Sequence, residues 1–162
     1  KLNKVQAKLS LPHLVRAMMA LDVDPGFVNH SFSKDGAGSR FNIYAIDKAV
    51  DILNAIAGTQ KVSNKVNLTS LKAMMKATAG LSRSIAKAAL SKQIRTSDAF
   101  IKEFADDRHT LAPSTTDTQT SSTMRILQAL GLVENRGSAR QAVYAFRDTK
   151  QAKAFTELLA AA

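Results

Sequence analysis

The sequence predicts a mainly helical fold with two short β-hairpins, and three observations lead to that expectation. Apolar residues recur every three to four positions along most of the chain, which is the period of an amphipathic helix. Residues 27–46 and 132–146 instead carry short β-branched and aromatic runs around glycine-containing turns, as hairpins do. Strands and helices do not alternate along the chain, which excludes a doubly wound parallel sheet.

Composition narrows the class of protein. The 162 residues suffice for one domain or two small ones, and 45% hydrophobic with 22% charged residues argues against general disorder. The absence of cysteine excludes disulfides, thiolate metal sites and a thiol nucleophile. No apolar run reaches the about 18–20 residues that cross a membrane, and no signal peptide is visible. We therefore expect a soluble protein of the cytoplasm that does not use a membrane.

The net charge of +10 is unevenly distributed. Residues 61–97 hold eight Lys or Arg and no Asp or Glu, whereas residues 1–60 carry a net +2 and residues 98–162 are neutral. Such a segment attracts polyanions, and nucleic acid is the commonest of these. A solvated helical face, a ribosomal protein or a membrane-surface protein would have the same charge, so charge alone leaves these alternatives open.

Seven helices are expected. The first begins near Ser10, with Pro12 in its first turn. The others are expected at residues 47–58, 68–79, 82–94, 96–108, 116–131 and 149–161. Ser82 is a good N-cap, a capping box begins at Thr116, and Gly131 is a good terminator.

The two expected hairpins match at an offset of 100 residues. The first has strands at 27–33 and 41–46, and the second opens at residue 132 and returns at 141–146. Residues 40–46 and 140–146 share three identities and two conservative apolar exchanges. Because each pair of strands lies between helices, a structural repeat is predicted.

Residues 120–134, a basic turn and residues 142–146 together resemble the winged-helix superfamily of DNA-binding proteins. The resemblance implies a recognition helix followed at once by a two-stranded wing. The hairpin at 27–46 looks like a second, divergent wing, which is similar to the tandem winged helices of plasmid and phage DNA-binding proteins, replication initiators included. The expected division is a divergent winged-helix-like half at 1–60, a basic helical segment at 61–97 and a winged-helix half at 98–162.

Candidate contact residues follow from where each side chain would meet a duplex. Short polar residues and Arg at the start of a recognition helix can read base edges, and Lys, Arg and hydroxyls elsewhere bind phosphates. The candidate base contacts are Thr118, Gln119, Ser121, Ser122 and Arg125. The candidate wing contacts are Lys34, Arg40, Arg136 and Arg140. The candidate phosphate contacts are Lys72, Lys76, Arg83, Ser84, Lys87, Lys92 and Arg95.

A second segment competes for the role of base reader. Residues 71–90 resemble a plain helix-turn-helix, with Gly80-Leu81-Ser82 at the turn and a basic second helix. Lys76 stands where a small residue is usual, and Ile85 arrives one residue early for the buried position. Which helix reads bases is therefore left open.

Catalytic chemistry is not predicted. The three histidines are far apart, and the adjacent carboxylates of Asp106 and Asp107 point in different directions on a helix. The Gly36-Ala37-Gly38 turn lacks the context of a phosphate-binding loop. We expect neither an enzyme nor a metal or other cofactor.

The predicted function is sequence-specific binding of double-stranded DNA by a plasmid- or phage-type transcription regulator or replication or partition factor, associated with the nucleoid. Two alternatives stay open: an adaptor whose winged helices contact an acidic protein, and a non-specific architectural binder of DNA or RNA. The oligomeric state is also open, with residues 149–161 as the candidate seam of a homodimer.

Overall fold

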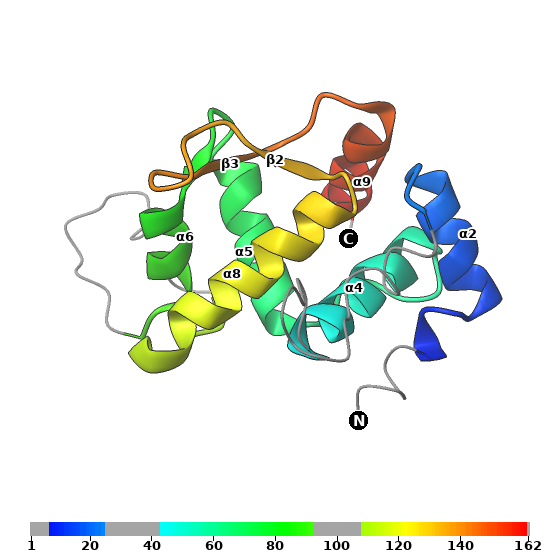
Figure 1. Cartoon of the computed structure of the whole chain (residues 1–162), viewed down its shortest axis with the longest axis horizontal. Helices are drawn as coiled ribbons and strands as arrows, with labels where there is room; N and C mark the ends of the chain where they lie inside the picture. The colour runs from blue at the N-terminus through cyan, green and yellow to red at the C-terminus, as the bar shows by residue number, and fades with distance from the viewer. Residues whose placement is uncertain (1–6, 25–42, 93–107, 162) are drawn as a thin grey trace.

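The computed structural model describes residues 7–24, 43–92 and 108–161 (Figure 1). These residues are mainly helical, as predicted. The helices are α2 (Pro12–Ala20), α4 (Ile43–Ile56), α5 (Lys65–Lys76), α6 (Arg83–Leu90), α8 (Pro113–Ala129) and α9 (Lys150–Ala160). The strands are β1 (Leu81–Ser82), β2 (Val133–Asn135) and β3 (Val143–Phe146). None of the described helices is both long and apolar enough to cross a lipid bilayer.

The three strands form one small antiparallel sheet in the order β1-β3-β2. The β2–β3 hairpin was predicted, and Val133 pairs with Phe146 across it. Strand β1 was not predicted, because two residues between α5 and α6 show no alternation. Leu81 of β1 lies opposite Tyr144 of β3, so the sheet joins the expected 61–97 segment to the expected 98–162 half.

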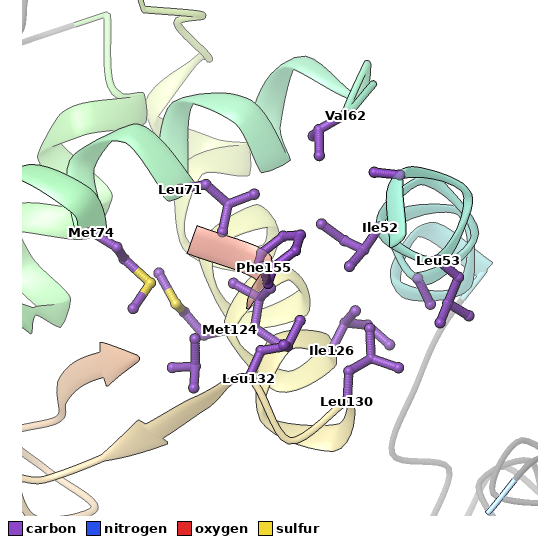
Figure 2. Packing of buried hydrophobic residues seen from close by; sticks show 14 of the residues in the cluster. Ile52, Leu53, Val62, Leu71, Met74, Met124, Ile126, Leu130, Leu132 and Phe155 are labelled. Carbon is purple, nitrogen blue, oxygen red and sulfur yellow. The ribbon is translucent and has the colours of Figure 1, made fainter. Parts of the chain in front are cut away.

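One hydrophobic core connects all the described helices, with α8 packed against α4, α5 and α6 (Figure 1). Figure 2 shows its centre, where Ile52 of α4, Leu71 of α5, Met124 of α8 and Phe155 of α9 converge. Each of these side chains is at most 2% exposed. The N-terminal and C-terminal parts of the chain, which the sequence predicts to be separate halves, therefore share one hydrophobic core.

The prediction of a first hairpin is wrong for residues 43–46, the part of it that lies within the described residues. Residues 43–46 form the first turn of α4 rather than a returning strand. Ala45, Ile46, Ala49, Ile52 and Leu53 are buried at helical spacing, so the apolar pattern of α4 begins inside the predicted strand. Because residues 143–146 are a strand, the match at offset 100 is not a structural repeat. The rest of that hairpin lies outside the described residues.

Helix α8 is longer than predicted and takes in the Ser/Thr-rich stretch. It begins at Pro113, which occupies the first helical turn, three residues before the expected capping box at Thr116. Thr116 and Thr120 are buried, and their hydroxyls donate to carbonyl oxygens one turn earlier. The predicted end at Gly131 is confirmed by its φ of 72°.

The predicted Ser82 cap is also confirmed, and Thr149 forms a further cap that was not predicted. The Ser82 hydroxyl accepts from the Ile85 N–H at 3.3 Å and opens α6. The Thr149 hydroxyl accepts from the Ala152 N–H at 3.1 Å and opens α9. The helix expected at 96–108 lies outside the described residues except for Arg108.

Candidate nucleic-acid interface

Helix α8 turns one stripe of side chains towards solvent. Ser114, Thr118, Arg125 and Gln128 are exposed, and Ser121 between them is half-buried. Their spacing of three and four residues places all five along one side of the helix, called here the outer face of α8. Three of the predicted base contacts, Thr118, Ser121 and Arg125, are on this face, and no acidic partner of Arg125 lies within the described parts of the chain.

The other two predicted base contacts, Gln119 and Ser122, point inward, which corrects the sequence-based assignment. The ammonium of Lys48 in α4 donates to the backbone oxygen of Gln119 at 3.1 Å and to its Oε1 at 2.6 Å. It also donates to the Ser122 hydroxyl. Ser122 is 6% exposed, so it cannot meet a base edge. Because α8 carries polar residues on both sides, its sequence does not show which side is buried.

Lys48 is an unusual core residue because it is 2% exposed and its acceptors are all neutral. Burial lowers the pKa of its ammonium to about 8. Asp51, one turn further along α4, is bound instead by the Ser63 N–H and the Asn67 amide, at 2.8 and 2.9 Å. Lys48 therefore fastens α4 to the middle of α8 without an ion pair.

A polar cluster joins α6, α8 and β3 on the other flank of α8. One Arg83 nitrogen donates to Asp117 Oδ1 at 2.8 Å and to the Ser121 hydroxyl at 2.6 Å, and the other reaches the Tyr144 hydroxyl at 3.3 Å. Lys87 Nζ lies 3.2 Å from the same Asp117 oxygen. These five residues are called the Arg83 cluster.

The hydrogen bonds of the Arg83 cluster favour the charged forms of both Arg83 and Asp117. Hydrogen bonds from Arg83 and Lys87 lower the pKa of Asp117 below its usual range. Burial lowers the pKa of Arg83, but the hydrogen bonds with Tyr144 and Asp117 outweigh it, so the net shift is upward. Both groups are thus charged at neutral pH. The side chains of Asp117 and Arg83 are 60% and 30% exposed, so an external anion can reach them.

The side chain of Asn135 bridges the two ends of the loop between β2 and β3, residues 136–142. Asn135 Oδ1 accepts from the N–H groups of Gly137 and Val143, at 2.9 and 3.0 Å. A Cβ on Gly137 would lie 2.1 Å from the Gln141 carbonyl oxygen, so the loop requires glycine there. We call residues 136–142 the wing loop.

The wing loop lies beside the Arg83 cluster, because the backbone N–H of Arg83 donates to the Ala142 carbonyl at 3.0 Å. Of the predicted wing contacts, Arg140 is exposed, whereas Arg136 forms an ion pair with Glu134 at 2.9 Å along the hairpin. Lys34 and Arg40 lie outside the described residues. The structure thus brings α6, the outer face of α8 and the wing loop to a common edge.

The predicted phosphate contacts divide between two surfaces. Arg83, Ser84 and Lys87 are on α6 at the common edge, and Lys92 is exposed just after that helix. Lys72 instead lines an apolar groove of about 700 Å³ between α5 and α9, with Leu68, Met75 and Leu158 among the other lining residues. Lys76 is exposed in the last turn of α5, and Arg95 lies outside the described residues.

Sequence reasoning missed three polar residues that organise this region. Lys48 is a lone cation among the apolar positions of α4, which could have marked it as a buried group. Asp117 is the only acid between residues 108 and 133, but it had been assigned to a capping box. Tyr144 was treated only as a strand residue, although its hydroxyl contacts Arg83.

No protein-family model, curated protein or solved structure matches the chain. Within residues 7–24, 43–92 and 108–161, no three His, Asp or Glu side chains gather as a metal site would require. The common edge of α6, α8 and the wing loop is the strongest candidate site among the described residues.

Proposed function

We propose that this protein binds double-stranded DNA as a winged helix, with the outer face of α8 in the major groove and the wing loop against the adjacent backbone or minor groove. The Arg83 cluster is the observation that carries the proposal. It links the outer face of α8 to the first turn of α6 and to the base of the wing loop. Three elements that would each touch a duplex therefore present one continuous edge.

The order of the elements supports this function. In winged-helix domains a helix, a short strand, two helices and a β-hairpin follow one another, and the short strand pairs with the last one. Among the described elements α5, β1, α6, α8, β2 and β3 follow in that order, with residues 93–107 between α6 and α8 outside the described residues, and β1 pairs with β3. In this comparison α8 corresponds to the recognition helix, which favours it over α6 as the base reader.

The side chains at the edge suit the two tasks of a DNA-binding surface. Arg125 can donate two hydrogen bonds to guanine, which discriminates against other bases by about 1–3 kcal/mol. Thr118 and Ser121 can bond base edges or phosphates, and Lys87 and Arg140 can neutralise phosphates. Target-site recognition of this kind serves transcription regulators and replication or partition factors of the nucleoid.

Binding to three probes of equal length tests the proposal: a duplex of random sequence, a single strand and an RNA hairpin. Each is titrated at several salt concentrations. We expect the duplex to bind most tightly, with log K falling against log salt at a slope of about −3 for some three neutralised phosphates. Enrichment of one duplex sequence from a random pool would support a regulatory role. The proposal fails if no duplex binds at low salt.

A further inference from the structure

The Arg83 cluster contains a carboxylate at a place where a DNA-binding surface gains from having none. Asp117 is exposed at the edge of α8, one residue from Thr118 and one turn from Ser121. It is the only Asp or Glu between residues 108 and 133. A fixed negative charge so close to the duplex repels the phosphate backbone.

The geometry of Asp117 is that of an anion held by two cations. One of its oxygens lies 2.8 Å from an Arg83 nitrogen and 3.2 Å from Lys87 Nζ. A phosphate oxygen would make the same two charge-assisted contacts. Arg83 is also anchored by Ser121 and Tyr144, so it keeps its position when its anionic partner changes.

We propose that Asp117 occupies an anion site that a DNA phosphate takes on binding, and that it thereby weakens binding to arbitrary sequences. This inference rests on the proposed function. In the free protein the Asp117 carboxylate neutralises part of the charge that Arg83 and Lys87 offer. On the duplex, Asp117 turns out into solvent, where 60% of its side chain already lies, and the phosphate replaces it.

The replacement makes affinity depend on contacts elsewhere. A phosphate that displaces Asp117 gains two ionic contacts but breaks two existing ones, so this site adds little net affinity. Sequence-dependent contacts of the outer face of α8 must then supply the difference. Asp117 therefore lowers the affinity for every duplex by the same factor. It leaves the ratio between matching and random sequences unchanged, but it keeps random duplexes below the affinity needed for occupancy, which only the extra contacts of a matching sequence restore.

The decisive variant is Asp117→Asn, which keeps the shape and an oxygen acceptor for Arg83 but removes the charge. We expect its affinity for a random-sequence duplex to rise by about 3- to 10-fold at low salt, and the slope of log K against log salt to become more negative by about one. The double variant Asp117→Asn with Lys87→Met should lose this gain. Glu157→Gln is the matched control, because it removes one exposed negative charge from α9 and should change affinity less than twofold.

The outcomes separate the inference from the function on which it rests. If wild type binds the duplex and Asp117→Asn binds no more tightly than Glu157→Gln, the inference is wrong and the proposed function stands. If neither wild type nor Asp117→Asn binds duplex at low salt, both are wrong. An equal gain for Asp117→Asn and Glu157→Gln would mean that only total charge matters, which also overturns the inference.

Discussion

Replacing Lys48 with methionine tests the buried cation that joins α4 to α8. Methionine fills a similar volume and carries no charge. The variant loses the contacts of the ammonium with Gln119 and Ser122, but it also loses the cost of burying a charge. These terms oppose each other at neutral pH. The informative quantity is therefore how the stability difference between wild type and Lys48→Met changes with pH.

The expected change follows from the pKa of Lys48. The folded protein lowers it from 10.5 to about 8, so between these values the unfolded chain binds more protons than the folded chain. Stability then rises with pH. The penalty for the buried ammonium is fully present below pH 8 and disappears as pH rises towards 10.5. Between pH 7 and pH 10 wild type should gain about 2 to 3 kcal/mol relative to Lys48→Met.

Urea unfolding of both proteins at pH 7, 8, 9 and 10, followed by circular dichroism, measures this difference. Groups that titrate identically in the two proteins cancel, as do the lost hydrogen bonds and repacking. Lys153→Met is a suitable control, because Lys153 is exposed and its pairing with Asp148 raises its pKa rather than lowering it, so any loss of stability falls above pH 10 and the difference should stay nearly flat over the range used. A Lys48→Met difference constant to within about 0.5 kcal/mol from pH 7 to pH 10 would refute the burial argument.

Three further predictions concern the interface and its supports. Arg125→Ala should flatten sequence preference in a duplex selection assay, whereas Arg140→Ala in the wing loop should weaken all duplexes alike; equal losses of preference would contradict this division. Arg108→Met should lower the free energy of unfolding by about 2 kcal/mol, because the guanidinium donates to the carbonyls of Ala88, Ala89 and Ser91 at the end of α6. Gly137→Ala should cost more stability in urea than Gly58→Ala, since a Cβ at Gly137 would lie 2.1 Å from a backbone oxygen, whereas Gly58→Ala brings only the strain of a φ of 78° with nothing within 4 Å; a cost at Gly137 no larger than at Gly58 would mean that the wing loop relieves the clash.

Local chemistry was enough to predict several elements of the fold. The Ser82 cap, the glycine end of α8 and the β2–β3 hairpin depend on contacts among near neighbours in the chain. The short apolar run at 43–46 was ambiguous, because four residues fit a strand or a helix equally well. Only its continuation through the buried positions of α4 decides for a helix.

The candidate site was harder to predict because its geometry depends on distant residues. Gln119 and Ser122 look as available as Thr118 and Ser121 until Lys48, more than 70 positions earlier, defines the inner side of α8. Likewise Arg83 and Asp117 are 34 positions apart, and their pairing requires α6 and α8 to pack side by side. Net charge identified the basic segment but could not tell that Lys72 and Arg83 occupy different surfaces.

Because Lys48 of α4 donates hydrogen bonds to residues of α8, α4 cannot be removed from the protein without disturbing α8. The side chains of Ile52 and Leu53 are fully buried with those of α8 and α9 in one cluster, so α4 forms one wall of the core beneath the proposed recognition helix. A fragment beginning at residue 61 would keep the three described strands and every residue of the Arg83 cluster, yet it would expose that wall to water. We therefore expect the smallest unit that folds on its own to begin no later than α4, so that α4 belongs to the same folded unit as the proposed DNA-binding surface.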